Sequence, residues 1–198
     1  MQNYHADFGS LPPAYVADEN GKPMHSWRVL LLPYLELKEV YEQYSFDEPW
    51  NGPNNSNLAE KGAGVYECPS RYEYPTRFTT GYLAVLGDQT PWSGSGTTNR
   101  QEIADGRDRI LIVESSVSVH WMEPRDLEFD QMSFSINDRG SRGIGSNHFT
   151  PAVFPKSNLG AHVLLIDGSV RFLGNRFDSE TIRSMLTTKS PEVVHLDR

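Results

Sequence analysis

The sequence predicts an α+β domain whose helices lie at the N-terminal side of a mainly antiparallel sheet. Residues 26–44 carry apolar side chains at helical spacing, which indicates helix. Later in the chain, short apolar segments rich in strand formers alternate with Gly- and Pro-rich loops. The 198 residues suffice for one domain, and no convincing linker divides them. We therefore expect a single domain over residues 1–198 with long irregular loops.

The first helices are expected in two places. Residues 1–10 have the pattern of a helix end that stops at Gly9. Residues 26–44 predict a helical hairpin that begins at Ser26 as N-cap. Pro33 lies in the middle of this segment and forces a bend or a break.

Two more helices and three strands are expected besides the hairpin near the C-terminus. A short helix is expected near residues 56–61. A final helix is expected to run to Leu186, with Asp178 or Ser179 as N-cap. Strands are expected at residues 65–70, 79–87 and 109–114, with Glu114 ending the last of them.

Residues 161–173 predict a tight β-hairpin, around which the rest of the domain is built. Asp167-Gly168 is a strong signal for a two-residue type I′ turn. Val170 and Phe172 then share one face of the returning strand. Asp167 lies at an exposed tip, where it serves turn geometry or contacts a ligand or metal ion.

Composition excludes several classes of function. The net charge of −8 and the absence of a basic patch argue against nucleic acid and against an anionic membrane surface. Cys68 is the single cysteine, so no disulfide forms within the chain and no multi-thiolate zinc site exists. The sequence has no bilayer-length apolar run and no visible signal peptide. Nucleotide-binding, nucleophile-elbow and zinc-protease motifs are missing as well.

One group of acidic and aromatic residues carries the candidate chemistry. It contains Glu114, Trp121, Glu123 and Asp126, with Arg28 or Arg125 as counter-charge. Such residues can bind Ca²⁺, form a buried ion-pair network with arginine, or recognise a carbohydrate by ring stacking and hydroxyl contacts. The calcium candidates are Glu114, Glu123, Asp126 and Asp167.

Two further possibilities belong to the same region. Trp92, in the loop over residues 88–100, is either a binding platform or part of the core. Glu114 and Glu123 would form the acid/base pair of a hydrolase, the least favoured of the alternatives.

Eight motifs, taken together, are similar to the planctomycete prepilin-type family of unknown function, whose C-terminal signature is H-x9-DG. The resemblance covers nearly the whole chain. It includes residues 3–5 with 11–13, 25–36, 47–50, 68–70, 82–85, 110–114, 121–127 and 167–172. His148 is the candidate signature histidine, but eighteen residues separate it from Asp167. Either residues 149–159 are an insertion, or His148 is not the signature residue.

The resemblance implies a pilin-like fold, with an N-terminal helix against an antiparallel sheet. Family members begin with a prepilin leader and a long hydrophobic helix, so residues 1–10 are expected to be the remnant of that helix. A cysteine in the missing helix would make Cys68 a disulfide partner. The implied location is extracytoplasmic, anchored in the membrane or at the cell surface.

The resulting hypothesis is a non-enzymatic pilin- or pseudopilin-like domain for surface assembly, secretion or adhesion. Its partners would be other pilin-like subunits or secretion machinery, contacted through the missing helix. The alternative is a membrane-tethered module that binds a solute or carbohydrate. For that role the candidate residues are Arg28, Trp92, Glu114, Trp121, Glu123, Asp126 and His148. No cofactor is required, and Ca²⁺ is an option by analogy with pseudopilins.

Overall fold

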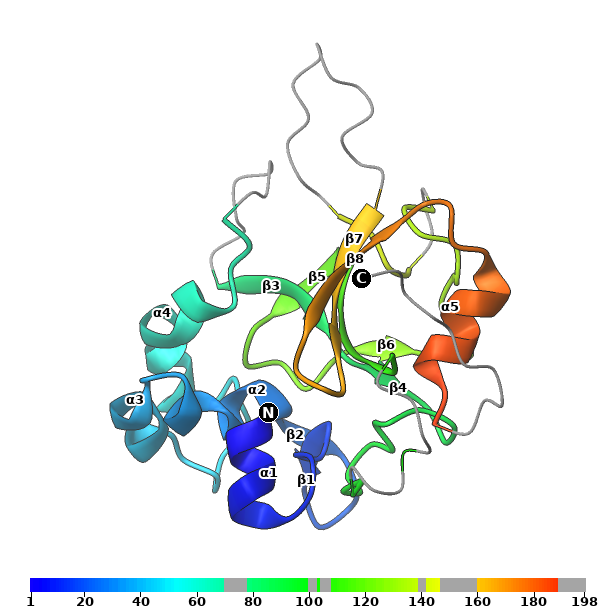
Figure 1. The fold of residues 1–198 in the computed structure, drawn as a ribbon. Helices are drawn as coiled ribbons and strands as arrows, with labels where there is room; N and C mark the ends of the chain where they lie inside the picture. Colours follow the sequence, from blue (N-terminus) through cyan, green and yellow to red (C-terminus); the bar gives the residue numbers. More distant parts are fainter. Residues whose placement is uncertain (70–77, 100–102, 104–107, 139–141, 147–159, 189–198) are drawn as a thin grey trace.

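A four-stranded antiparallel sheet forms the centre of the part of the chain that the structure describes (Figure 1). In this computed structural model the described residues are 1–69, 78–99, 103, 108–138, 142–146 and 160–188. The α+β class with antiparallel sheets is confirmed. The strand order is β3-β5-β7-β8, with β3 at Thr79–Leu83, β5 at Ile110–His120, β7 at Gly160–Leu165 and β8 at Val170–Gly174.

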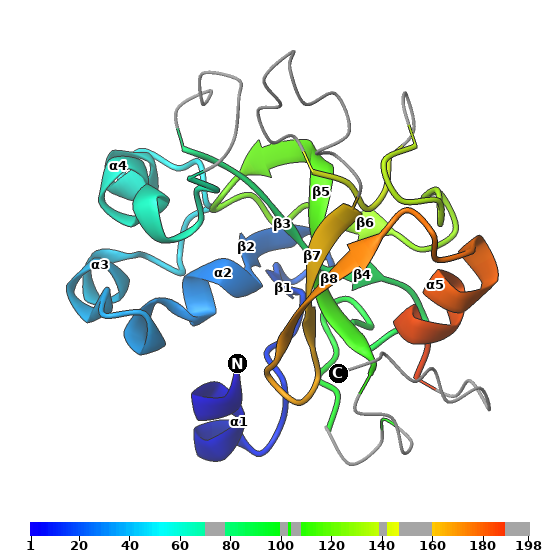
Figure 2. The ribbon, with the colours of Figure 1, turned by 45° about the horizontal axis from the view of Figure 1, so that its top comes forward.

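The first helices lie on one side of this sheet, and α5 lies on the other side (Figure 2). Instead of the kinked helical hairpin expected over residues 26–44, the chain forms three short pieces. Pro33 lies within the middle piece, and Glu36 has a φ of 61°, so the helix is broken rather than kinked. The pieces are α2 at Trp27–Leu30, η1 at Leu32–Tyr34 and α3 at Lys38–Gln43.

Two predicted helix boundaries are confirmed, the end of the first helix and the start of the last. Helix α1 spans Gln2–Phe8, and Gly9 follows it in the left-handed conformation with a φ of 73°. Helix α5 spans Ser179–Leu186, and the Asp178 carboxylate accepts a hydrogen bond of 2.7 Å from the Thr181 N–H.

The prediction of a strand at residues 65–70 is wrong for the residues described there. Helix α4 at Ala59–Gly62 continues into the 3₁₀ helix η3 at Ala63–Val65, and no strand follows up to residue 69. The Tyr66 ring stacks on Trp121 with centroids 5.7 Å apart, and its hydroxyl donates to the Arg28 carbonyl. These tertiary contacts outweigh the local strand preference. Before α4, the 3₁₀ helix η2 covers Asn55–Leu58.

Glu114 lies inside β5 and does not end it. The strand continues to His120, and Tyr82 of β3 lies opposite Glu114 in the register. The single strand expected over residues 79–87 is two strands in the structure. Strand β3 ends at Leu83, and a separate short strand β4 covers Val85–Leu86. Strand β4 pairs in parallel with β6 at Leu127–Glu128.

The β7–β8 hairpin closes through a turn of a different type from the one expected. Only Gly168 has a positive φ, 89°, whereas a type I′ turn needs two such residues. The Leu165 N–H donates to the Ser169 carbonyl, and the Gly168 N–H donates to the Leu165 carbonyl. The loop therefore has three residues, 166–168, the arrangement in which a turn ends with a left-handed glycine.

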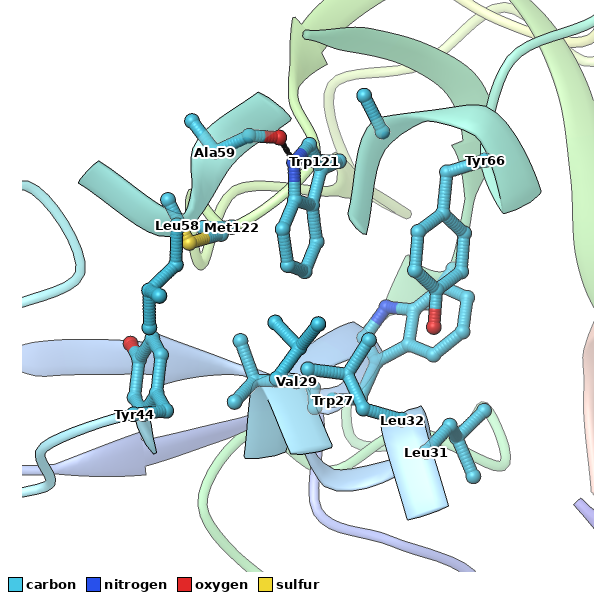
Figure 3. Packing of buried hydrophobic residues seen from close by; sticks show 14 of the residues in the cluster. Trp27, Val29, Leu31, Leu32, Tyr44, Leu58, Ala59, Tyr66, Trp121 and Met122 are labelled. Carbon is cyan, nitrogen blue, oxygen red and sulfur yellow. Dashed lines mark hydrogen bonds between the residues drawn. The ribbon is translucent and has the colours of Figure 1, made fainter. Parts of the chain in front are cut away.

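Two large apolar clusters and a small third one, made of Leu11, Ile103, Leu111 and Ile166, form the core of the described residues. The first surrounds Trp27 and Trp121 and lies between the N-terminal helices and the loop after β5 (Figure 3). The second lies between the central sheet and α5, with Val163, Leu173 and Ile182 among its members. A small two-stranded sheet, β1 at Tyr15–Ala17 and β2 at Pro23–Ser26, leads into the first cluster. In the described part of the chain, no helix has the length and apolar character needed to cross a membrane.

Candidate functional site

A buried ion pair between Arg28 and Asp126 lies at the centre of the predicted site. The Arg28 Nη2 atom is 2.6 Å from Asp126 Oδ1, and the two side chains are 0% and 1% exposed. The same carboxylate oxygen accepts the Ala84 backbone N–H at 2.8 Å. The Trp27 indole N–H lies 3.2 Å from the other oxygen, Oδ2. The pair therefore joins three segments that are distant in sequence.

The Arg28 guanidinium has no donor left for a ligand. Its Nε and Nη2 groups donate to the Tyr82 carbonyl at 3.2 and 2.9 Å. Its Nη1 group donates to Ser26 Oγ at 2.9 Å and to the Glu123 carbonyl at 3.4 Å. With the bond to Asp126, all five guanidinium N–H groups have acceptors.

The environment of Asp126 is that of a structural charge. Burial raises the pKa of its carboxyl group, and the Arg28 charge and the Ala84 and Trp27 hydrogen bonds oppose that shift. Among the three alternatives for this region, the structure gives Asp126 the buried ion-pair network.

Trp92 and Trp121 do not face a ligand. They are 2% and 0% exposed, so neither ring can stack on a sugar, and the expectation of a tryptophan platform is corrected. The Trp92 indole N–H donates to the Leu111 carbonyl at 2.7 Å, and the Trp121 indole N–H donates to the Ala59 carbonyl at 2.8 Å (Figure 3). Large rings with both faces packed belong to the core.

Glu114 belongs to a second group of polar residues on the central sheet. Its Oε2 atom accepts the His162 backbone N–H at 2.9 Å and lies 3.4 Å from the His162 Nδ1 atom. The Cys68 thiol lies 3.9 Å from Glu114 Oε1. Burial raises the pKa of the neighbouring Tyr82, and the contact with Cys68 and the Glu114 charge raise it further.

The two proposed hydrolase acids have separate partners. Glu114 faces Cys68 and His162, whereas the Glu123 carboxylate pairs with the Arg125 guanidinium at 2.8 and 3.0 Å. Arg125 is thus the counter-ion of Glu123, and Arg28 is the counter-ion of Asp126. The geometry therefore gives no support to an acid/base pair.

The calcium candidates do not converge either. Asp167 Oδ1 accepts the Ser169 N–H at 2.8 Å and the Ser169 hydroxyl at 2.7 Å, which is turn geometry. Within the described ranges, no three His, Cys, Asp or Glu side chains are grouped so as to hold a metal ion. His148 lies outside the described residues.

A family model described as a protein of unknown function, DUF1559, matches residues 1–126. The chain belongs to this family. No curated protein and no solved structure shows significant similarity to it.

The DUF1559 match contains both members of the buried ion pair, because it ends at Asp126. It also contains Cys68, Tyr82 and Glu114, whereas His162 lies beyond it. Sequence analysis singled out Glu114 but missed its contacts with Tyr82 and His162. Strand register alone brings these residues together, and only a pairing of β3, β5 and β7 could have revealed it.

Proposed function

We propose that this DUF1559 chain is a non-enzymatic, extracytoplasmic domain of a pilin- or pseudopilin-like protein that acts in surface assembly, secretion or adhesion. The observation that carries the proposal is an apolar outer surface on the β7–β8 hairpin. Val170 and Phe172 are 61% and 54% exposed, although both lie in a regular strand. Adjacent exposed apolar side chains mark surfaces that contact other proteins.

The geometry of the hairpin explains why these side chains point outward. Side chains alternate between the two faces of a strand, and Leu173 of β8 and Val163 of β7 point into the second cluster. Val170 and Phe172 therefore lie on the opposite face. Strand β8 is also the last strand in the order, so the apolar pair lies at an edge of the described sheet.

Helix α1 is attached to this same hairpin, which supports the comparison with a pilin-type helix. The Gln2 side-chain amide donates to the Asp167 carbonyl at 2.6 Å. Tyr4 packs into the first cluster, while Phe8 is 64% exposed. We propose that partner subunits or secretion machinery contact the protein at this end, through a helix that precedes α1.

The internal contacts of the polar side chains support a non-enzymatic role. Arg28 and Asp126 are saturated by internal contacts, and Glu114 and Glu123 have separate partners. The proposed role requires no cofactor. We expect equal melting temperatures in calcium and in chelator, because the Asp126 and Asp167 oxygens already accept internal hydrogen bonds.

The alternative, a membrane-tethered module for a solute or carbohydrate, loses its predicted aromatic platforms. Trp92 and Trp121 are buried, so such a module needs a site built from other residues.

The assembly proposal is tested on the full-length protein in its native host. External protease should degrade the domain on intact cells, and the double variant Val170→Ser/Phe172→Ser should lower its recovery in sheared, high-molecular-weight surface material. Val65→Ser is the matched control, because Val65 is another exposed apolar residue, 44% exposed, on η3. Protection from external protease, or unchanged recovery of the double variant, would contradict the proposal.

A further inference from the structure

A surface cavity of about 330 Å³ lies between the β1–β2 sheet and the β4–β6 pair. Its volume is within the range of small-molecule sites. Its two exposed carboxylates, Asp88 and Glu128, are not among the residues predicted for ligand binding. Its lining includes Tyr15, Asp88, Ser93, Pro124, Arg125 and Glu128.

Regular structure and close packing hold the walls in place. Gly94 adopts a φ of +83°, and a Cβ atom there would lie 3.0 Å from the Tyr15 hydroxyl oxygen. The Ala14 N–H donates to the Gly94 carbonyl at 2.8 Å, which fixes the two segments against each other. Glu128 lies on β6, which pairs with β4. These contacts fix the walls of the cavity at Tyr15, Gly94 and Glu128.

The charges at this cavity do not cancel. Asp126 contributes to the lining, but Arg28 balances its charge. Arg125 is paired with Glu123. Asp88 and Glu128 are exposed, and neither carboxylate has a hydrogen-bond or ion-pair partner within the described ranges. Among the described residues, the lining therefore carries two carboxylates without a compensating cation, beside one aromatic ring.

We propose that this cavity binds a small organic cation that carries a primary ammonium group. Asp88 and Glu128 would accept its hydrogen bonds, and the ring of Tyr15, which is part of the lining, would add a cation–π attraction. A concave acidic surface also raises the local concentration of cations. The inference is independent of the assembly proposal, because Val170 and Phe172 take no part in the cavity.

Calorimetric titration of the intact chain with a matched pair of probes tests the charge requirement. The probes are 1,4-diaminobutane and 1,4-butanediol, which share chain length and differ in charge. We expect saturable binding of the diamine that weakens with salt, and no binding of the diol. Absence of diamine binding, or equal binding of both probes, would overturn the inference.

Variants distinguish the cavity from attraction to the acidic protein as a whole. Asp88→Asn/Glu128→Gln should weaken diamine binding by about tenfold or more. Glu39→Gln/Glu60→Gln removes the same charge from exposed positions on α3 and α4 and should leave binding unchanged. Equal weakening by both double variants would mean non-specific attraction and reject the site. Circular dichroism verifies folding, and the wild-type probe pair remains decisive for a variant that does not fold.

Discussion

Arg28 connects more separate parts of the chain than its position in a four-residue helix suggests. Its side chain donates to the Ser26 hydroxyl, the Tyr82 carbonyl and the Asp126 carboxylate. Its carbon Cζ also lies 4.5 Å from the centroid of the Trp27 ring. Because the Arg28 charge is fully buried, the stability of the fold depends on these acceptors.

Loss of the Asp126 charge tests this dependence. Asp126→Asn keeps the size of the side chain but leaves the buried Arg28 charge without a counter-ion, so we expect a loss of about 3–5 kcal/mol in the free energy of unfolding. Urea denaturation measures the loss. Glu123→Gln, in the neighbouring surface pair with Arg125, should cost no more than about 1 kcal/mol. Similar losses for the two variants would show that Arg28 does not depend on its counter-ion.

The buried His25 and the half-buried His120 make stability depend on pH. Burial lowers the pKa of His25 and of His120 below the usual value of 6.5. Below that value the unfolded chain binds protons that the folded chain does not bind. The free energy of unfolding should therefore decrease as the pH falls from 6.5 through the lowered pKa values.

Urea denaturation at a series of pH values measures this slope. His25→Gln should make the slope shallower, whatever its effect on stability at neutral pH. The same slope in the variant and the wild type would remove His25 as a cause.

At the residue scale, the sequence identified charged residues but not their partners. Arg28 was expected to balance an acid in this region, and its partner is Asp126. The burial of Trp92 could not be predicted, because a Gly- and Ser-rich loop allows the ring to point either way. The inward position of the ring depends on the Leu111 carbonyl of β5, which accepts the hydrogen bond of the Trp92 indole N–H.

Among the secondary-structure elements, β5 is one whose whole length follows a local sequence pattern. The apolar run at residues 110–113 predicted the start of the strand. The alternation that continues after Glu114 places Val117 and Val119 against the second cluster, and it is itself a strand signal. At residues 65–69 the local pattern predicts a strand that does not form. Tyr66 instead contacts Trp121 and the Arg28 carbonyl.

The turn of the β7–β8 hairpin gives a prediction for a single element. Gly168 has a φ of +89°, and a Cβ atom there would also collide with the Gln2 amide. Gly168→Ala should therefore destabilise the fold by about 1–2 kcal/mol or more. Gly64→Ala is the matched control, because Gly64 lies in η3 with open space around it. We expect that control to be neutral or to stabilise by up to about 1 kcal/mol. Equal urea midpoints for the two variants would contradict the role of Gly168.

In the whole molecule, the segment from β3 to β4 joins the two large apolar clusters. Leu83 and Val85 point into the second cluster, whereas Ala84 and Leu86 point into the first. The ion pair reinforces this junction, because Asp126 binds the Ala84 N–H and Arg28 binds the Tyr82 carbonyl. Local patterns predicted an antiparallel sheet, but not that β5 pairs with β7, from which β6 separates it in the chain.

The junction predicts that the two clusters unfold together. All four tryptophans pack in the first cluster or against it, so their fluorescence reports on that cluster alone. The β-sheet signal in far-UV circular dichroism comes mainly from the central sheet, whose four strands all line the second cluster. Because alternate residues of one segment belong to both clusters, neither can be lost while the other keeps its packing. We therefore expect fluorescence and dichroism to change with the same urea midpoint. A fluorescence change that is complete while the sheet signal remains would show that the clusters are independent and that the Arg28–Asp126 pair does not couple them.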